Sequence, residues 1–249
     1  PEHRGGQLSE AKKAKGAPAE AATEPAAERR PGAFAVPRER MEALAGPMTD
    51  GQAAQLKRYG QLLMAHAQKM SLVSKHELGR LDVHLVDSAA VLAHRDLPSG
   101  PDAMTADLGT GAGLPGVVLA VLRPDARVAL VDSRRSRVVF LKMVVRELEL
   151  DNVEIVHDRI EALVGKRAFD LCVARALGKL DEVLVPSLGV VAPGGALVLF
   201  KGPKWQEECA RAAQMASDAG AKLATERTIE LPGTDRSTTF AEFEVPAGG

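Results

Sequence analysis

The residues with the clearest chemical potential lie in the segment 106–116, which reads ADLGTGAGLPG. An acid, Asp107, ends a short apolar segment, and Gly109, Gly111 and Gly113 follow it at alternate positions. Glycines let the chain turn sharply and bring backbone N–H groups against a ligand, and the apolar run behind them predicts a helix whose N-terminus faces that ligand. Strand, glycine loop and helix in this order predict a binding site for a nucleoside cofactor.

Two cofactors fit this loop. Gly111, Gly113 and Gly116 match the spacing of the dinucleotide fingerprint, and Asp132 ends the next apolar segment, where an acid would bind ribose hydroxyls. Asp107 distinguishes between the two cofactors. A carboxylate before the first glycine repels a pyrophosphate, but it suits the amino group and sulfonium of S-adenosylmethionine. The loop therefore favours S-adenosylmethionine, with a nicotinamide dinucleotide as the alternative.

The elements that position these residues alternate between strands and helices from residue 103 onward. This alternation predicts an α/β fold with a parallel sheet and helices on both faces. We expect strands near residues 103–108, 127–132, 152–157, 169–174 and 195–201 and an amphipathic helix over 134–149. Two later apolar segments, Lys222 to Leu231 and Thr238 to Val245, are joined by a turn too short for a crossover helix, so they must be antiparallel. A parallel core followed by an antiparallel hairpin is typical of class I (Rossmann-like) methyltransferases.

Ligands of open parallel sheets lie beyond the carboxyl ends of the strands. After the third expected strand the chain turns through Ile160 and Glu161, where an adenine would rest. Arg175 and Lys201 end the fourth and fifth, and a cation there costs free energy unless an anion joins it. For Arg175 we expect a carboxylate or RNA contact rather than a salt bridge with Asp107 or Asp170. Lys201 contacts RNA or simply reaches water, and the following Trp205 is expected to pack.

From Val36 to Pro98 the periodicity is helical. Thr49 and Gln52 have the spacing of a capping box, and a later helix is striped by apolar residues from Leu78 to Leu92. That later helix carries a polar triplet at one-face spacing, His84, Asp87 and Ser88. We expect the triplet to fix this helix to its neighbours by hydrogen bonds, with contact to a ligand as the alternative.

The composition limits the partners and the compartment. The chain has 32 Lys and Arg against 33 Asp and Glu and therefore no net positive charge. A nucleic acid would have to be bound by a local basic patch. Cys172 and Cys209 lack metal-ligand spacing, so we expect a reduced compartment and no metal. The uncharged run 183–200 is broken by prolines and glycines, which argues against a membrane span. We therefore expect a cytoplasmic protein.

Three regions are expected along the chain. Residues 1–33 are rich in Ala, Glu, Lys, Gly and Pro and predict a disordered tail. Residues 34–100 form a helical subdomain, and residues 101–249 form the nucleoside-binding domain. No stretch indicates a surface for a stable dimer, so we expect a monomer.

Five motifs in register, DLGTGAGLPG, LVDSRRSRVVFL, FDLCVARA, LFKG and the upstream HLVDS, resemble the glucose-inhibited division protein B family. The resemblance runs from about Met41 to Val245. It implies a methyltransferase that uses S-adenosylmethionine to methylate N7 of a guanine in 16S ribosomal RNA, with the RNA or the small ribosomal subunit as partner. It also implies that Gly109 and Leu114 contact the methionine moiety, Asp132 the ribose, and Ile160 and Glu161 the adenosine. Arg175 would then stand at the cofactor and target site as the candidate catalytic residue.

The chain departs from the family pattern at five positions, which are His66, Ala67, Ser71, Val73 and Ser136. At Ser136 the family has a lysine, and the neighbouring Arg134, Arg135 and Arg137 supply charge for RNA, together with Lys201. Two other functions remain possible for this sequence. One is a nicotinamide dehydrogenase, and the other is a non-catalytic protein that binds RNA or the ribosome. A dehydrogenase would need a sixth parallel strand, and the non-catalytic protein would release no methylated product.

Overall fold

The computed structural model describes residues 34–66, 70, 75–202 and 205–248. The predicted tail, residues 1–33, lies outside these ranges, and so do the family departures at Ala67, Ser71 and Val73.

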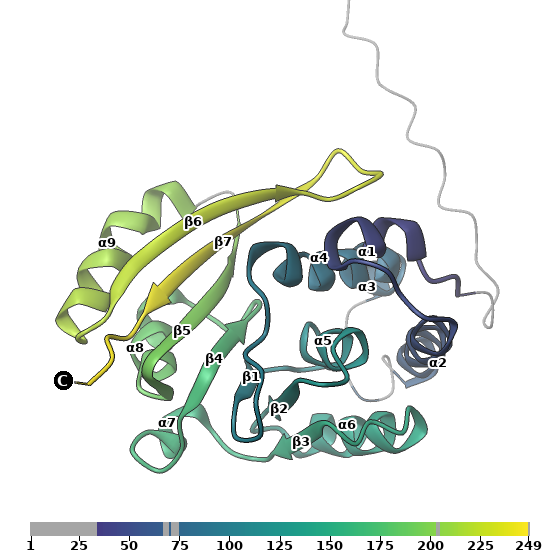
Figure 1. Cartoon of the computed structure of the whole chain (residues 1–249), viewed down its shortest axis with the longest axis horizontal. Helices are drawn as coiled ribbons and strands as arrows, with labels where there is room; N and C mark the ends of the chain where they lie inside the picture. The colour runs from purple at the N-terminus through teal and green to yellow at the C-terminus, as the bar shows by residue number, and fades with distance from the viewer. Residues whose placement is uncertain (1–33, 67–69, 71–74, 203–204, 249) are drawn as a thin grey trace, which may run out of the picture.

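A single twisted sheet of seven strands, in the order β3-β2-β1-β4-β5-β7-β6, organises the described part of the chain (Figure 1). The strands are β1 (Met104–Leu108), β2 (Arg127–Val131), β3 (Val153–Val156), β4 (Phe169–Ala174), β5 (Val191–Lys201), β6 (Lys222–Glu230) and β7 (Ser237–Glu244). The first five are parallel, whereas β7 runs antiparallel between β5 and β6. Strand order reverses between β1 and β4, and a crevice for a ligand is expected at such a switch point.

Helices cover both faces of the sheet (Figure 1). On one face lie α1 (Arg38–Ala45), α2 (Asp50–His66), α4 (Leu81–His94), α5 (Gly116–Leu122) and α6 (Arg135–Glu147), and on the other lie α7 (Ile160–Leu163), α8 (Leu180–Leu188) and α9 (Trp205–Asp218). Successive strand residues point to opposite faces. On β2, Val128 and Leu130 therefore join one hydrophobic cluster, and Ala129 and Val131 join the other. Because both faces are covered there, the central strands β2 and β4 are apolar over nearly their whole length rather than alternating.

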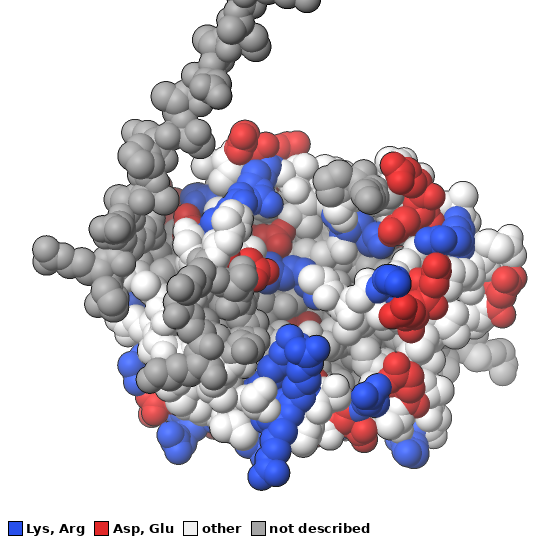
Figure 2. Space-filling view, turned by 180° about the vertical axis from the view of Figure 1, so that it is seen from behind, with Lys and Arg blue, Asp and Glu red and all other residues white. Residues whose placement is uncertain are grey.

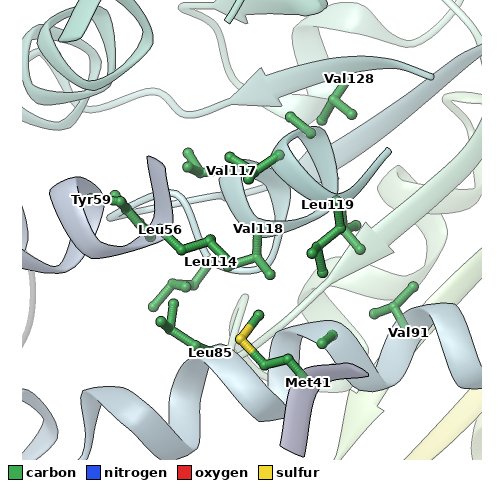
Figure 3. Close-up of a cluster of buried hydrophobic side chains, with 14 of the residues drawn as sticks. Met41, Leu56, Tyr59, Leu85, Val91, Leu114, Val117, Val118, Leu119 and Val128 are labelled. Carbon is green, nitrogen blue, oxygen red and sulfur yellow. The ribbon is translucent and has the colours of Figure 1, made fainter. Parts of the chain in front are cut away.

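The N-terminal helices share a core with the helix that follows the glycine loop (Figure 3). Met41 from α1, Leu56 from α2 and Leu85 from α4 are fully buried against Val118 and Leu119 of α5. The boundary that we expect near residue 100 falls between α4 and β1, yet the side chains before and after it pack together. The helical segment therefore supports the glycine loop from behind.

Most sequence-based expectations for the elements are confirmed. Each predicted strand of the parallel core is present, and the C-terminal segments pair as an antiparallel hairpin. The capping box at the start of α2 also forms, because the Thr49 N–H donates to Gln52 Oε1 at 2.8 Å and the Gln52 N–H donates to Thr49 Oγ1 at 3.2 Å. The fold is thus the class I, Rossmann-like arrangement.

Two boundaries differ from the prediction. The helix expected through Leu78 is divided, since α3 (Lys75–Leu78) ends at a turn before α4 begins at Leu81. β5 begins at Val191 rather than at Gly195, because the register to β4 shifts and the extra residues form an irregular segment. Gly194 lies there with φ +80°, a conformation that glycine adopts without a steric penalty.

Candidate active site

Asp107, at the carboxyl end of β1, is the centre of the glycine loop. Its side chain is fully buried, and Oδ2 accepts hydrogen bonds from Thr110 Oγ1 at 2.6 Å and from the Gly116 N–H at 2.7 Å. The carboxylate therefore holds both ends of the loop. Oδ1 is buried as well, and within the described residues it has no hydrogen-bond partner.

Burial controls the ionisation of this carboxyl group. Loss of hydration raises the pKa of Asp107 from 3.8 to about 6, although the hydrogen bonds from Thr110 and Gly116 and the nearby Arg175 favour the charged form. At neutral pH the group is still largely ionised. A buried carboxylate with an unpartnered oxygen is suited to a cationic ligand.

Tyr59 of α2 holds the opposite side of the glycine loop. The hydroxyl of this fully buried residue donates to the Ala112 carbonyl at 2.8 Å. Gly113 has φ +102°, and a Cβ there would lie 3.1 Å from the Tyr59 hydroxyl and 2.6 Å from Val117 Cγ2. The loop is therefore clamped in a conformation that requires glycine at this position.

We expect Tyr59→Phe to loosen the loop. The Ala112 carbonyl would lose a buried donor, so the free energy of unfolding should fall by about 1–3 kcal/mol. Because the loop N–H groups would be less well oriented, affinity for S-adenosylhomocysteine should fall about fivefold, the equivalent of about 1 kcal/mol. Thermal unfolding and isothermal titration calorimetry measure the two effects.

Thr49→Ala is the matched control for Tyr59→Phe. It removes the cap of the same helix at a cost of about 1 kcal/mol but leaves the hydroxyl on Ala112 in place. The control should be less stable and bind S-adenosylhomocysteine normally. Equal affinities in wild type and Tyr59→Phe would contradict a role for the hydroxyl in the loop.

Asp132, just after β2, forms the second acidic position. It is only 4% exposed, and its carboxylate accepts from the Gly111 N–H at 3.0 Å and from the Arg134 N–H at 2.8 Å. Arg137 Nη1 completes an ion pair with Asp132 at 3.1 Å. Asp132 thus ties the glycine loop to the start of α6. Arg137, expected from the sequence to contact RNA, faces this acid.

A cavity of about 320 Å³ opens beside these residues, at the low end of the range for small-molecule sites. Four of the expected cofactor residues line it, namely Gly109, Asp132, Ile160 and Glu161. The wall after β3 is completed by the N-terminus of α7 together with Asp158 and Arg159. The loop after β4 closes the other side of the cavity. The cavity therefore lies at the switch point between β1 and β4.

Two placements near the cavity are not evident from the sequence. Leu177, in the loop after β4, packs against Gly109, and its Cδ1 lies 2.2 Å from where a Cβ at Gly109 would be. Any side chain at Gly109 would collide with it. Leu114, expected to contact the methionine moiety, is 5% exposed and packs in the core with Leu56 and Tyr59 (Figure 3). Only the backbone of Leu114 can contact a ligand in the site unless its side chain leaves the core.

Arg175 follows β4, and it forms a salt bridge with an acid that the sequence analysis did not consider. Its guanidinium pairs with Asp87 of α4 at 3.0 Å, not with Asp107 or Asp170, and lies 3.5 Å from His84 Nδ1. Asp87 also accepts a hydrogen bond from Thr238 Oγ1 at the start of β7. Burial and the nearby Arg175 lower the pKa of His84. Two members of the polar triplet therefore hold the arginine, and α4 is joined to β7.

A second cavity, of about 760 Å³, lies on the other side of the loop after β4. Arg175 lines this second cavity, Leu177 lines the first, and Ala176 belongs to both walls. Lys201 also lines the second cavity, where it pairs with Glu208 at 2.8 Å and lies 4.8 Å from the Trp205 ring centroid. Trp205 is 2% exposed, which confirms that it packs.

The remaining predicted RNA contacts lie on the surface. Arg134 and Arg135 are exposed where α6 begins, and the family departure Ser136 is exposed beside them. Basic and acidic side chains alternate over most of the face shown in Figure 2, with one larger basic group near its lower centre. The face shown thus has local rather than general positive charge.

Within the described ranges, no group of three or more His, Cys, Asp or Glu could hold a metal ion. Among the helices that the structure describes, none is long and apolar enough to cross a membrane.

Comparison with protein families gives a match over residues 52–230 to the family described as rRNA small subunit methyltransferase G. A curated protein of that name from Nocardioides sp. is 44% identical over 153 residues, which are 61% of this chain and 60% of the relative. Another, from Beutenbergia cavernae, is 36% identical over 206 residues, covering 82% of this chain and 95% of the relative.

Solved structures share the fold at low identity. A SAM dependent methyltransferase from Aquifex aeolicus has a TM-score of 0.50 and 20% identity, covering 70% of this chain and 99% of that one. TYW2 from P. horikoshii, in complex with MeSAdo, has a TM-score of 0.50 and 15% identity, covering 67% and 63%. These likenesses concern the arrangement of strands and helices.

Proposed function

The chain belongs to the rRNA small subunit methyltransferase G family, and from its own site we propose that it transfers a methyl group from S-adenosylmethionine to N7 of a guanine in 16S ribosomal RNA. The protein would bind its substrate either as free RNA or as part of the small ribosomal subunit. With ribosomal RNA as substrate, the proposal places the protein in the cytoplasm. The monomeric state stays a prediction.

One observation carries the choice of cofactor. Asp107 is fully buried at the end of β1, and its Oδ1 has no partner among the described residues. A nearby ammonium or sulfonium would satisfy this oxygen, whereas a pyrophosphate would be repelled by it. The nicotinamide dehydrogenase required another parallel strand after β5, and the strand beside β5 is the antiparallel β7.

The cofactor would extend along the strand ends from Asp107 toward α7. Asp107 and the backbone of the glycine loop, including Gly111, Gly113 and Leu114, would hold the methionine end. Asp132 would bind the ribose hydroxyls, for which Arg137 must release part of the carboxylate. Ile160 and Glu161, which line the cavity, would hold the adenosine. When bound, S-adenosylmethionine supplies a methyl group activated by a sulfonium.

The chemistry asks little of the protein beyond placement. Guanine N7 carries a free lone pair, which forms the new bond to carbon while the pair of the broken carbon–sulfur bond stays on sulfur. No proton is removed, so no general base is required. Holding the reactants in line can contribute roughly 7–11 kcal/mol in favourable cases.

Arg175 is the proposed catalytic residue. Asp87 fixes its guanidinium toward the second cavity, and Arg175 is also close enough to Asp107 to favour the ionised carboxyl group there. It would orient the methionine end or donate to the O6 and N7 edge of guanine, a pairing that arginine geometry favours. Arg134, Arg135, Arg137 and Lys201 are proposed to neutralise RNA phosphates.

A methylation assay tests the function. The purified protein is incubated with labelled S-adenosylmethionine and small-subunit RNA that lacks its own modification, and chemical cleavage then reports N7-methylguanosine. We expect one cleavage site. Binding of S-adenosylhomocysteine without label in free RNA or in small subunits would favour the non-catalytic RNA-binding alternative.

A further inference from the structure

The second cavity is a part of the site that cofactor binding leaves unused. Its volume of about 760 Å³ is ample for one nucleotide, and pockets for small molecules span roughly 300–1,000 Å³. Its wall is built from α4, the ends of β4 and β5, the first turn of α9 and the β6–β7 hairpin. No part of the first cavity except Ala176 is shared with it.

The second cavity lies close to the place where Asp107 would hold the methionine end of the cofactor, and methyl transfer requires the acceptor to be near that end. Asp107 would hold the methionine end of the cofactor, and Arg175 lies near enough to influence the charge of that carboxyl group. The same Arg175 lines the second cavity. A nucleophile in the second cavity would therefore approach the methyl group beside Ala176, from the side opposite the adenosine.

The cavity wall has the chemistry of a nucleotide site. Phe200 offers an aromatic ring, and Thr239 and Ser237 offer hydroxyl groups that can accept from or donate to a base edge. Arg236 is exposed at the rim, and its side chain forms no hydrogen bond or ion pair within the described part of the chain. An unpaired cation at the rim of a cavity with an aromatic ring and hydroxyl groups can bind a nucleotide, with the base in the cavity and its phosphate at the cation.

We propose that the second cavity takes the target guanosine after it has swung out of the RNA, with N7 directed toward Ala176. This inference rests on the proposed function. Enzymes that modify a base remove it from its stack to reach the reacting atom, and single-stranded loops of RNA allow this at low cost. Phe200 packs beside the base, Thr239 and Ser237 contact its polar edge, and Arg236 binds the adjoining phosphate.

Filling the cavity tests this assignment. Thr239 is half-buried and Ser237 is exposed at the start of β7, so Thr239→Phe and Ser237→Phe each place a ring where the base would lie. We expect kcat/KM for RNA methylation to fall about 100-fold in both variants, as for a misplaced substrate, with unchanged affinity for S-adenosylhomocysteine. Thermal stability should be unchanged in Ser237→Phe and lower in Thr239→Phe, which loses the hydrogen bond between Thr239 Oγ1 and Thr228 Oγ1. Thr225→Phe on β6, exposed and away from the cavity wall, is the matched control and should methylate normally.

Crosslinking provides a test on the unaltered protein. The guanosine that wild type methylates is replaced by photoreactive 6-thioguanosine, and crosslinked peptides are mapped. Crosslinks to residues 200–202, 205–206 or 236–239 support the assignment. Crosslinks confined to other segments, or normal methylation by folded Thr239→Phe and Ser237→Phe, would overturn it. A wild type that methylates no RNA would instead refute the proposed function.

Discussion

Replacing Asp107 with asparagine is expected to abolish methyl transfer and to remove one pH-dependent component of stability. Asparagine can still accept from Thr110 and Gly116, but it offers no negative charge to a cationic ligand. Losing one partner of a buried charge pair costs about 3–5 kcal/mol, so affinity for S-adenosylhomocysteine should fall at least about 100-fold. Calorimetric titration at pH 7.5 measures this loss.

The pH dependence gives the Asp107 prediction a second readout. Because burial raises the pKa of Asp107 from 3.8 to about 6, the protonated form is favoured in the folded protein. The associated stability is fully present below pH 3.8 and is lost as the pH rises through about 6. The loss amounts to about 3 kcal/mol, and it should appear in wild type and be absent from Asp107→Asn in urea unfolding between pH 4 and pH 7.5. Wild-type affinity for S-adenosylhomocysteine should be about tenfold weaker at pH 5 than at pH 7.5, because a cation needs the ionised carboxylate.

Glu242→Gln is the matched control for a buried acid outside the site. Hydrogen bonding from His94 and the nearby Arg95 lower the pKa of Glu242, so its stability contribution is present above its ordinary pKa of 4.5 and is lost on acidification. This variant should be destabilised at pH 7.5 but should bind S-adenosylhomocysteine normally. Matching pH profiles for wild type and Asp107→Asn would show that burial of Asp107 does not shift its ionisation.

Replacing Arg175 with alanine should reduce single-turnover methyl transfer at saturating S-adenosylmethionine by at least about 100-fold, the size of effect seen when one stabilising donor is removed from an active site. The chain should still fold, with a loss of stability of about 1–3 kcal/mol because the Asp87 carboxylate loses a charged partner. Arg175→Lys keeps the charge but not the planar fork, and we expect it to restore only part of the rate.

Arg167→Ala is the control for Arg175→Ala, since Arg167 lies at the amino end of the same strand. It pairs with Glu154 at 2.6 Å and has a side chain of similar exposure, 29% against 19% for Arg175. Removing it should cost stability without affecting transfer. A normal rate in folded Arg175→Ala would exclude Arg175 from the reaction.

The glycine loop and the sheet could be predicted from the sequence because their causes are local. Asp107 and the glycines after it define a turn by their own conformational preferences, and each short apolar strand segment can be seen within a few residues. The short connection between β6 and β7 excludes a crossover helix, so the antiparallel hairpin also followed from the chain alone. The position of the cofactor loop at the end of β1 is a consequence of these local rules.

Contacts between distant segments were decided by the tertiary structure alone. The sequence offered two acids for Arg175, Asp107 and Asp170, and the packing of α4 against α5, β6 and β7 selected Asp87, which lies 88 positions earlier. Leu177 against Gly109 and the burial of Leu114 likewise depend on how the loop after β4 and helix α2 pack.

What the sequence by itself determined is therefore the type of fold, the cofactor loop and the candidate residues at the strand ends. The division of those residues between two cavities required the structure. Ala176 belongs to both walls, whereas Arg175 and Leu177 face opposite sides of it. The physical reason is that side-chain direction in an irregular loop follows no period, so only the packed neighbours of the loop settle which side chain faces which cavity.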